Sequence, residues 1–278
     1  MIREEVREQL IEMLSRDEGS IELDRVALMI AAEEYPHLEI EKYLGVLDSF
    51  ARQARELDDR DGGPLDRIRR LSGMLFTDLG FRGNVKNYYD VRNSYLNEVI
   101  DRRTGIPITL SIILIETARR IDLRLSGVGM PGHFLAKYAD NDFEIYIDPF
   151  NGGRLISLER CREIFEGMYG SRPGFQRSVL VAVTKRQILT RMLLNLKGIY
   201  GRAKDNQKTL SVIERLLLID PAAATEIRDR GLIYFSMDRY TLAQADLEEY
   251  LRRVPNADDT KEIRTKLGEL RRRQARLN

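Results

Sequence analysis

The sequence of 278 residues contains one cysteine, two histidines and no tryptophan. A single cysteine excludes an internal disulfide framework and a cysteine-rich zinc site, and it is typical of a reducing compartment. His133 and scattered carboxylates are too small a ligand set for zinc, so we expect neither a metal nor another cofactor. Long apolar runs are missing as well, because none approaches the roughly 20 residues that span a bilayer.

A strong excess of charge of one sign is also absent. The formal net charge is +1, so the composition favours neither nucleic acid nor an anionic membrane as a partner. The last residues, RRRQARLN, hold four arginines without interleaved aromatics, which is typical of a solvated helix and not of a nucleic-acid site. The start, MIREEVREQL, is acidic and unlike a signal peptide, so we expect a cytoplasmic protein.

Helical periodicity dominates the first part of the chain. The spacing of apolar residues predicts helices over residues 2–15, 21–35, 40–57, 64–79 and 91–102. Residues 107–121 are nearly apolar all round, which predicts a buried helix. Pro107 suits the first turn of that helix, where its missing N–H costs no hydrogen bond.

A short antiparallel sheet is expected after this helix. Apolar residues alternate with a period of two in Leu123–Leu125, Phe134–Ala136 and Phe143–Ile147, and Val179–Val183 is a further candidate strand. Asp140-Asn141-Asp142 has the composition of a hairpin turn. Ser157 predicts the N-cap of a helix. The inward side chains of that helix would be Leu158, Cys161, Phe165 and Met168, so Cys161 is interpreted as a small buried hydrophobe.

The order of these elements has a chemical interpretation. A helix is followed by a strand that begins beside His133 and by a strand that ends at Asp148. This is the chain order of papain-type and transglutaminase-type catalytic cores, in which a nucleophile lies at the helix N-terminus, histidine is the base and aspartate orients it. The alternative is that His133 and Asp148 form a structural contact that joins two strands.

Three motifs carry a family resemblance. GIPITLS, PGHF and YIDPFNGG, in this order, resemble the SirB family of bacterial transglutaminase-like proteins over about residues 70–278. The resemblance implies a degenerate transglutaminase-type core followed by tetratricopeptide repeats, with His133 at the place of the base and Asp148 at that of the acid. Active transglutaminase-like enzymes carry a cysteine in the first turn of the buried helix, and Gly105–Thr109 contains none. Phe134 also replaces the usual tryptophan.

Other residues are candidates for the nucleophile or for contacts with a ligand. Cys161 follows both His133 and Asp148, which is out of order for this fold. Thr109 and Ser111 lie near the helix N-terminus and could use His133 as a base. The alternative, which is favoured, is that they serve helix packing and capping. The candidate cleft consists of Asn97, Glu98, Arg102, His133 and Asp148.

The C-terminal part has the signature of a repeat. Pro221 and Pro255 are separated by the 34-residue tetratricopeptide period, and Gly231, Tyr234 and Ala243 fall at its small, aromatic and small positions. This period predicts two antiparallel helix pairs, over residues 184–219 and 222–254, followed by a terminal helix.

Together these patterns predict an α+β, mostly helical protein. The expected regions are a helical N-terminal region (1–64), a transglutaminase-like, papain-type core with a small antiparallel sheet (65–183) and a tetratricopeptide-like region (184–278). The expected function is that of a non-catalytic interaction or regulatory module with a protein or peptide partner. Two alternatives stay open. One is a peptidase, amidase or acyl-transfer enzyme that uses His133 and Asp148 with Ser111 or Thr109, and the other is a ligand-binding scaffold that uses the same cleft.

Overall fold

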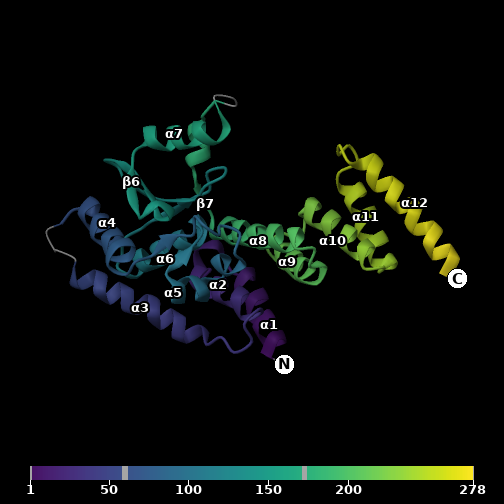
Figure 1. Ribbon diagram of the computed structural model, residues 1–278, viewed down its shortest axis with the longest axis horizontal. Helices are drawn as coiled ribbons and strands as arrows, with labels where there is room; N and C mark the ends of the chain where they lie inside the picture. Colours follow the sequence, from purple (N-terminus) through teal and green to yellow (C-terminus); the bar gives the residue numbers. More distant parts are fainter. Residues whose placement is uncertain (1, 58–61, 171–173, 278) are drawn as a thin grey trace. The chain divides into compact units, whose positions relative to one another are not determined.

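The computed structural model describes residues 2–57, 62–170 and 174–277, which form two compact units, Met1–Met192 and Leu193–Asn278 (Figure 1). The described chain is α+β and mostly helical with a small antiparallel sheet, as predicted. Helix α8 (Lys185–Arg202) contains the boundary between the two units. The three-part division at residues 64 and 183 stays a prediction.

The first four predicted helices are confirmed. They are α1 (Ile2–Ser15), α2 (Leu23–Ala32), α3 (Ile40–Glu56) and α4 (Pro64–Gly73). In α3 the apolar residues at helical spacing, among them Leu47 and Phe50, form the buried face. The predicted helix from Pro64 keeps its helical course past Gly73, but residues 74–78 are wound as a π-helical turn.

The helix predicted over residues 91–102 is interrupted. A 3-10 turn covers Val91–Ser94, Tyr95 is extended, and α5 runs over Leu96–Arg102. The buried side chain of Asn93 donates hydrogen bonds to the carbonyl oxygens of Asn87 and Tyr88, which stabilises the irregular backbone before the break. The preceding loop contains a two-residue strand, β1 (Arg82–Gly83), which pairs in parallel with β2 (Thr104–Gly105).

The main sheet has five antiparallel strands in the order β6-β5-β4-β3-β7. They are β3 (Ser126–Val128), β4 (Leu135–Ala139), β5 (Glu144–Asp148), β6 (Arg154–Ile156) and β7 (Ala182–Val183). The predicted strand at Leu123–Leu125 is wrong, because these residues lead out of the preceding helix. Asp122 has a left-handed φ of 58° and the Leu123 N–H caps the carbonyl of Ala118.

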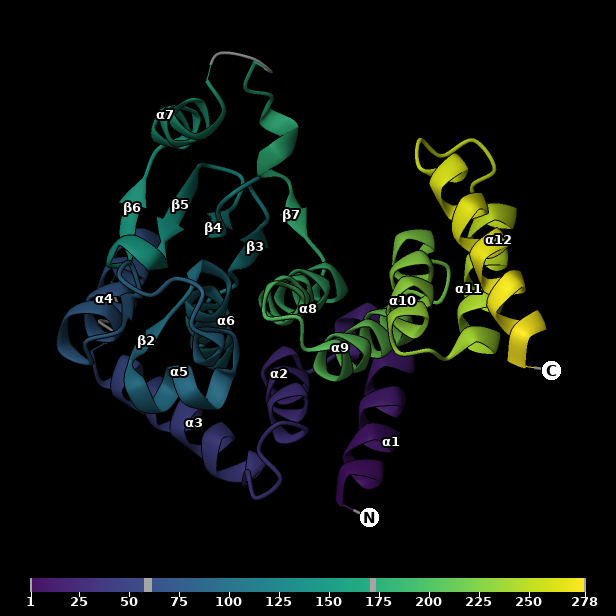
Figure 2. The same cartoon turned by 45° about the vertical axis from the view of Figure 1, so that its right-hand side comes forward.

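Two helices cover opposite faces of this sheet (Figure 2). On one face lies α6 (Pro107–Arg120), in which every residue from Pro107 to Ala118 is buried, as its apolar sequence predicts. On the other lies α7 (Leu158–Tyr169), whose N-cap Ser157 accepts a hydrogen bond from the Arg160 N–H. Cys161 and Phe165 of α7 are buried against Leu135 and Tyr146, but Met168 is 48% exposed and was wrongly predicted to point inward.

The predicted helix pairs begin with α8, and the second unit starts within this helix. After α8 come α9 (Asn206–Ile219), α10 (Ala224–Ser236), α11 (Tyr240–Arg253) and the terminal α12 (Thr260–Leu277). The small residues of the repeat pattern lie where α10 and α11 meet. Ala243 is fully buried, and a Cβ on Gly231 would lie 2.9 Å from Cδ2 of Leu247. These two positions therefore allow the close helix contact that the 34-residue period requires.

Candidate functional site

His133 is positioned by a tight turn just before β4. Its backbone N–H donates to the carbonyl of Met130, and Gly132 between them has a φ of 73°. A Cβ at Gly132 would lie 2.8 Å from Sδ of Met168. The positive φ favours glycine here, so the residue before His133 is determined by the turn.

Asp148 is held at the end of β5 through both carboxylate oxygens. Oδ1 accepts the backbone N–H of Asn151 at 3.2 Å, and Oδ2 accepts the Asn151 side-chain amide at 2.8 Å. The carbonyl of Asp148 accepts the Gly153 N–H at 2.9 Å. The turn after the strand therefore fixes the carboxylate in one orientation.

The turn and the strand end bring His133 and Asp148 together. Nε2 of His133 lies 3.0 Å from Oδ1 of Asp148, and both side chains are buried. The ring N–H does not point along this contact, so Nε2 lacks a well-directed hydrogen bond and the attraction is mainly electrostatic. The Phe150 ring packs edge-on against the His133 imidazole, and the centroids of the two rings lie 6.3 Å apart.

The electrostatics of the pair favour an ionised aspartate. Burial raises the pKa of the Asp148 carboxyl, but His133 and the hydrogen bonds from Asn151 outweigh it, so the pKa is lowered overall. A carboxylate beside Nε2 favours the tautomer with its proton there, which leaves the lone pair on Nδ1. That nitrogen can accept a hydrogen bond from a ligand or a proton from a bound hydroxyl.

A pocket of about 400 Å³ contains this pair. Its lining comes from α6, α7, the strand ends and the loop after β1: Tyr88, Pro107, Gly132, His133, Asp148, Phe150, Asn151, Arg154, Ile156, Arg160, Ile164 and Met168. Among the lining residues, Pro107 is the one that comes from the first turn of α6. Tyr88, Arg154 and Arg160 had no signal in the sequence, because the pocket joins segments that are far apart in the chain.

Thr109 and Ser111 are fully buried, and neither lines this pocket. The Thr109 hydroxyl donates to the Asn93 carbonyl at 2.8 Å and accepts the Ile106 N–H at 3.2 Å, so it caps α6 and anchors the preceding segment. The Ser111 hydroxyl has no hydrogen-bond partner in the described part of the chain.

The other residues of the candidate cleft lie elsewhere, which corrects the single cleft predicted from the sequence. Asn97 and Glu98 line a different pocket, of about 410 Å³, beside His37 and Tyr43. Arg102 contacts Asp90 and Asn93, each at 3.5 Å, and is not in the lining around His133. The break at Tyr95 sets the directions of these side chains, and no periodic pattern predicts that break.

Cys161 is a buried thiol, as predicted. It has no exposed surface, and it packs with Leu135 and Phe165. Burial, followed by the negative charges of Asp148 and Glu144, raises the pKa of this thiol to about 12. A thiol in this state is protonated at neutral pH and is a poor nucleophile.

Across residues 2–57, 62–170 and 174–277, no three His, Cys, Asp or Glu side chains gather closely enough to hold a metal ion. None of the helices in these ranges combines the length and apolar character needed to cross a bilayer.

Known proteins resemble this chain over nearly its whole length. Residues 41–194 match the family described as "Transglutaminase-like superfamily", and residues 196–268 match a tetratricopeptide repeat family. A UPF0162 protein of Xylella fastidiosa (strain 9a5c) is 36% identical over 258 residues, which cover 91% of this chain and 92% of that protein. A UPF0162 protein of Pseudomonas aeruginosa is 31% identical and covers 89% and 90% of the two chains.

A more distant relative shares only the central part. F-box only protein 21 of Homo sapiens is 31% identical over 146 residues, which are 48% of this chain and 21% of that protein. No solved structure matches the chain.

Proposed function

This chain belongs to the transglutaminase-like superfamily, as a member of the UPF0162 proteins, and we propose that it is an interaction module whose transglutaminase-like core binds without catalysing acyl transfer. The tetratricopeptide repeat region, a class that generally mediates contacts between proteins, is the proposed partner-binding element. We further propose that the UPF0162 proteins and the SirB family, which the sequence motifs resemble, are one family.

The observation that carries the proposal is Pro107 in the pocket of His133 and Asp148. Acyl transfer of this type needs a nucleophile at the helix N-terminus, where backbone N–H groups stabilise a thiolate and the histidine pairs with it. Proline has no nucleophilic side chain and no N–H. Without the nucleophile, binding and polarisation alone leave only ~10³–10⁴-fold rate enhancement over water.

The hydroxyl-nucleophile alternative has weaker support. Thr109 already uses its hydroxyl in the cap of α6, and Ser111 is closed off from solvent. A nucleophile has to reach both the base and the substrate, so two buried hydroxyls outside the pocket lining favour the non-catalytic proposal.

The proposed use of the His133 pocket is to hold a peptide segment. Nδ1 of His133 can accept one hydrogen bond, and the exposed side chain of Arg154 has no hydrogen-bond or ion-pair partner in the described ranges. Tyr88 and Phe150, with ring centroids 5.9 Å apart, provide an aromatic wall. Such a mixture of aromatic walls and few polar groups is common in binding pockets.

Turnover measurements test the non-catalytic core. Purified wild type, Cys161→Ala, Ser111→Ala and His133→Ala are incubated with a glutamine peptide plus an amine and with a peptide ester. We expect no turnover above background in any of the four. Turnover that disappears in Cys161→Ala would overturn the proposal, and turnover lost in both Ser111→Ala and His133→Ala would establish the hydroxyl enzyme instead.

Partner capture tests the repeat region with a matched pair of leucines. Leu242 in α11 and Leu57 at the end of α3 are both 48% exposed, but only Leu242 belongs to the repeat unit. We expect Leu242→Asp to lose the proteins that wild type captures from a lysate, while Leu57→Asp retains them. Equal capture by the two variants, both folded by circular dichroism, would contradict a role for this face of the repeat unit.

A further inference from the structure

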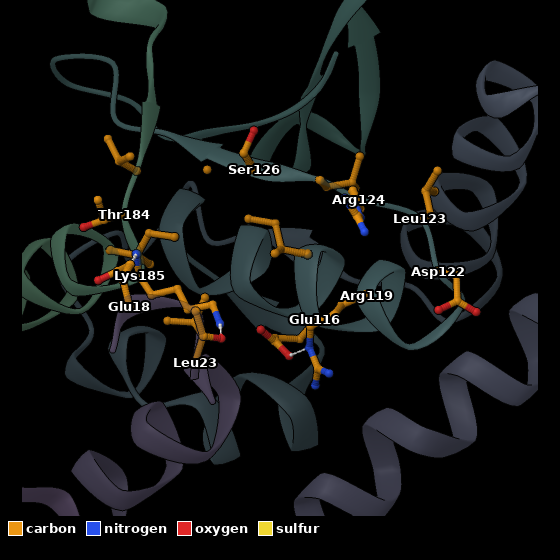
Figure 3. Close-up of a pocket in the computed structure, with 16 residues that line it drawn as sticks. Glu18, Leu23, Glu116, Arg119, Asp122, Leu123, Arg124, Ser126, Thr184 and Lys185 are labelled. Atoms are coloured by element: carbon orange, nitrogen blue, oxygen red, sulfur yellow. Dashed lines mark hydrogen bonds and ion pairs between the residues drawn. The ribbon is translucent and has the colours of Figure 1, made fainter. Parts of the chain in front are cut away.

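The C-terminal part of α6 borders a second cavity, with a volume of about 610 Å³ (Figure 3). Its apolar wall includes Leu23, Ile115, Leu123 and Ile188, all of them buried. Its polar lining consists of six charged side chains and two hydroxyls: Glu18, Glu116, Arg119, Asp122, Arg124, Lys185, Ser126 and Thr184. Small-molecule sites have volumes of roughly 300–1,000 Å³ and a mostly apolar lining with a few convergent polar groups, so this cavity has the dimensions of a ligand site.

Two guanidinium groups in the lining have unused donors. Figure 3 shows Arg124 pointing from the segment before β3 towards α6, whereas the guanidinium of Arg119 is turned back along α6 to Glu116. Arg124 is exposed and forms no hydrogen bond or ion pair with any residue that the structure describes. The Nε of Arg119 donates a 2.8 Å hydrogen bond to Glu116. One of its terminal nitrogens lies 4.0 Å from Asp24, which is too far for a hydrogen bond. The Arg124 guanidinium can therefore still donate to an oxygen anion, which its fork geometry fits.

The negative groups of the lining are mostly neutralised within the fold. Glu116 is contacted by both Arg119 and Arg120, at 2.8 and 3.3 Å. Glu18 pairs with Arg186 at 2.9 Å and accepts the Lys185 backbone N–H. Asp122 is the remaining carboxylate, exposed at the edge of the cavity. Asp122 and the C-terminus of α6, which adds about half a negative charge, are opposed by Arg124 and by the ammonium of Lys185, which donates to the carbonyl oxygens of Gly19 and Ile21.

We propose that this cavity binds a small amphiphilic carboxylate, with its anionic group at Arg124 and its apolar body against Ile115, Leu123 and Ile188. The site is separate from the His133 pocket. Pro107 and Arg119 are twelve residues apart along one helix, which is about 18 Å at 1.5 Å per residue. The ligand is either a free medium-chain carboxylate or the carboxylate at the C-terminus of a peptide that ends in an apolar residue.

Titration calorimetry with matched probes tests the charge requirement. Octanoate is compared with neutral octanamide, and a four-residue peptide ending in leucine with its C-terminal amide. We expect saturable binding of at least one carboxylate and about tenfold weaker binding of its neutral counterpart. Saturation by octanoate alone identifies the free carboxylate as the source, and saturation by the peptide acid alone identifies the peptide C-terminus.

Substitutions test the assigned residues. Arg124→Gln removes an exposed, unpaired side chain and should fold normally, and we expect it to weaken binding about tenfold. The control Arg69→Gln removes an exposed arginine of α4 that pairs with Asp66, and it should leave the affinity unchanged, as should His133→Ala. Asp122→Asn, which keeps a residue tolerant of left-handed backbone, should leave binding unchanged or strengthen it.

Four results would overturn the proposal: no saturation by either carboxylate, equal binding of acid and amide, unchanged affinity in Arg124→Gln, or loss of affinity in Asp122→Asn. The last result would show that the Asp122 carboxylate supports binding, which is the opposite of the repulsion expected between it and a bound carboxylate. Circular dichroism and thermal unfolding of each variant establish that any loss arises at the site and not from unfolding.

Discussion

The two ends of helix α6 differ in how they hold charge. At the N-terminal end Pro107 borders a pocket in which one histidine contacts one carboxylate, and both are held by backbone turns. At the C-terminal end Arg120 connects Asp24, Asp48 and Glu116 from three helices. The first end therefore depends on the precise course of two loops, and the second on a buried network of opposite charges.

The two ends also shift carboxyl pKa values in opposite directions. At Asp148 the favourable contacts outweigh burial, and the pKa is lowered. At Glu116 burial and the nearby charge of Asp24 outweigh Arg119 and Arg120, and the pKa is raised. The difference teaches that an ion-pair network does not by itself favour the charged form, because a second buried carboxylate competes for the same cations.

The largest expected effect concerns accessibility at the N-terminal end. In a Cys161→Ala background, Pro107→Cys should react with iodoacetamide at least about a hundredfold faster than Cys161 does in wild type, because an accessible helix N-terminus lowers a thiol pKa. The Cys161 thiol is fully buried, with a pKa raised to about 12. Mass spectrometry at timed intervals gives both rates. Similar rates would mean that the first turn of α6 is closed to solvent.

The next effect concerns the network at the C-terminal end. Arg120→Ala would remove the buried cation shared by Asp24 and Glu116, each 1% exposed, and leave them only the half-exposed Arg119. Breaking a buried pair in this way costs about 3–5 kcal/mol, so the free energy of unfolding should fall by that amount in urea titrations.

The matched control for this change is the neighbouring arginine. Arg119 has a 53% exposed side chain, and Arg119→Ala should cost no more than about 1 kcal/mol. Equal losses for the two variants would contradict the central role given to Arg120.

The smallest effect is the pH dependence of stability, which should have opposite signs at the two ends. Asp148 has a lowered folded-state pKa, so its contribution is present above its unfolded pKa of about 3.9 and is lost as the pH falls through the folded value. Glu116 has a raised pKa, so its contribution is present below about 4.3 and is lost as the pH rises through the folded value.

Thermal unfolding midpoints between pH 3 and pH 7 measure this contrast. The advantage of wild type over Asp148→Asn should shrink toward low pH, and its advantage over Glu116→Gln should shrink toward high pH. Parallel curves for the two variants would show that both carboxyls titrate alike and would remove the distinction between the ends.

Much of the fold was predictable because it is periodic. The buried helix from Pro107, the hairpin around Asp140 and the helix pairs around Gly231 all follow from spacing and from turn residues. The wrong predictions concern segments whose backbone is held by local hydrogen bonds and whose sequence has no matching periodic pattern. Asn93 binds the backbone before the break at Tyr95, and Asp122 delays the start of β3 to Ser126.

The site was predictable only in part. The chain order helix, His133, Asp148 predicts their meeting, because each residue lies at an end of one of two paired strands. Tyr88 and Arg154 were not predictable, since each reaches the pocket from a segment without a recognisable motif. Asn97 and Glu98 were assigned to the wrong pocket because their direction depends on the helix break before them.

The sequence by itself determined the α+β class, the repeat in the C-terminal unit and the absence of a cysteine from the first turn of α6, since composition and period are properties of the chain alone. Only the tertiary structure decided that Pro107 faces His133 and Asp148, that Ser111 and Thr109 do not line their pocket, and that Arg124 enters a second cavity. The physical reason is that side-chain direction depends on breaks, left-handed residues and buried contacts between segments distant in sequence, none of which leaves a periodic pattern.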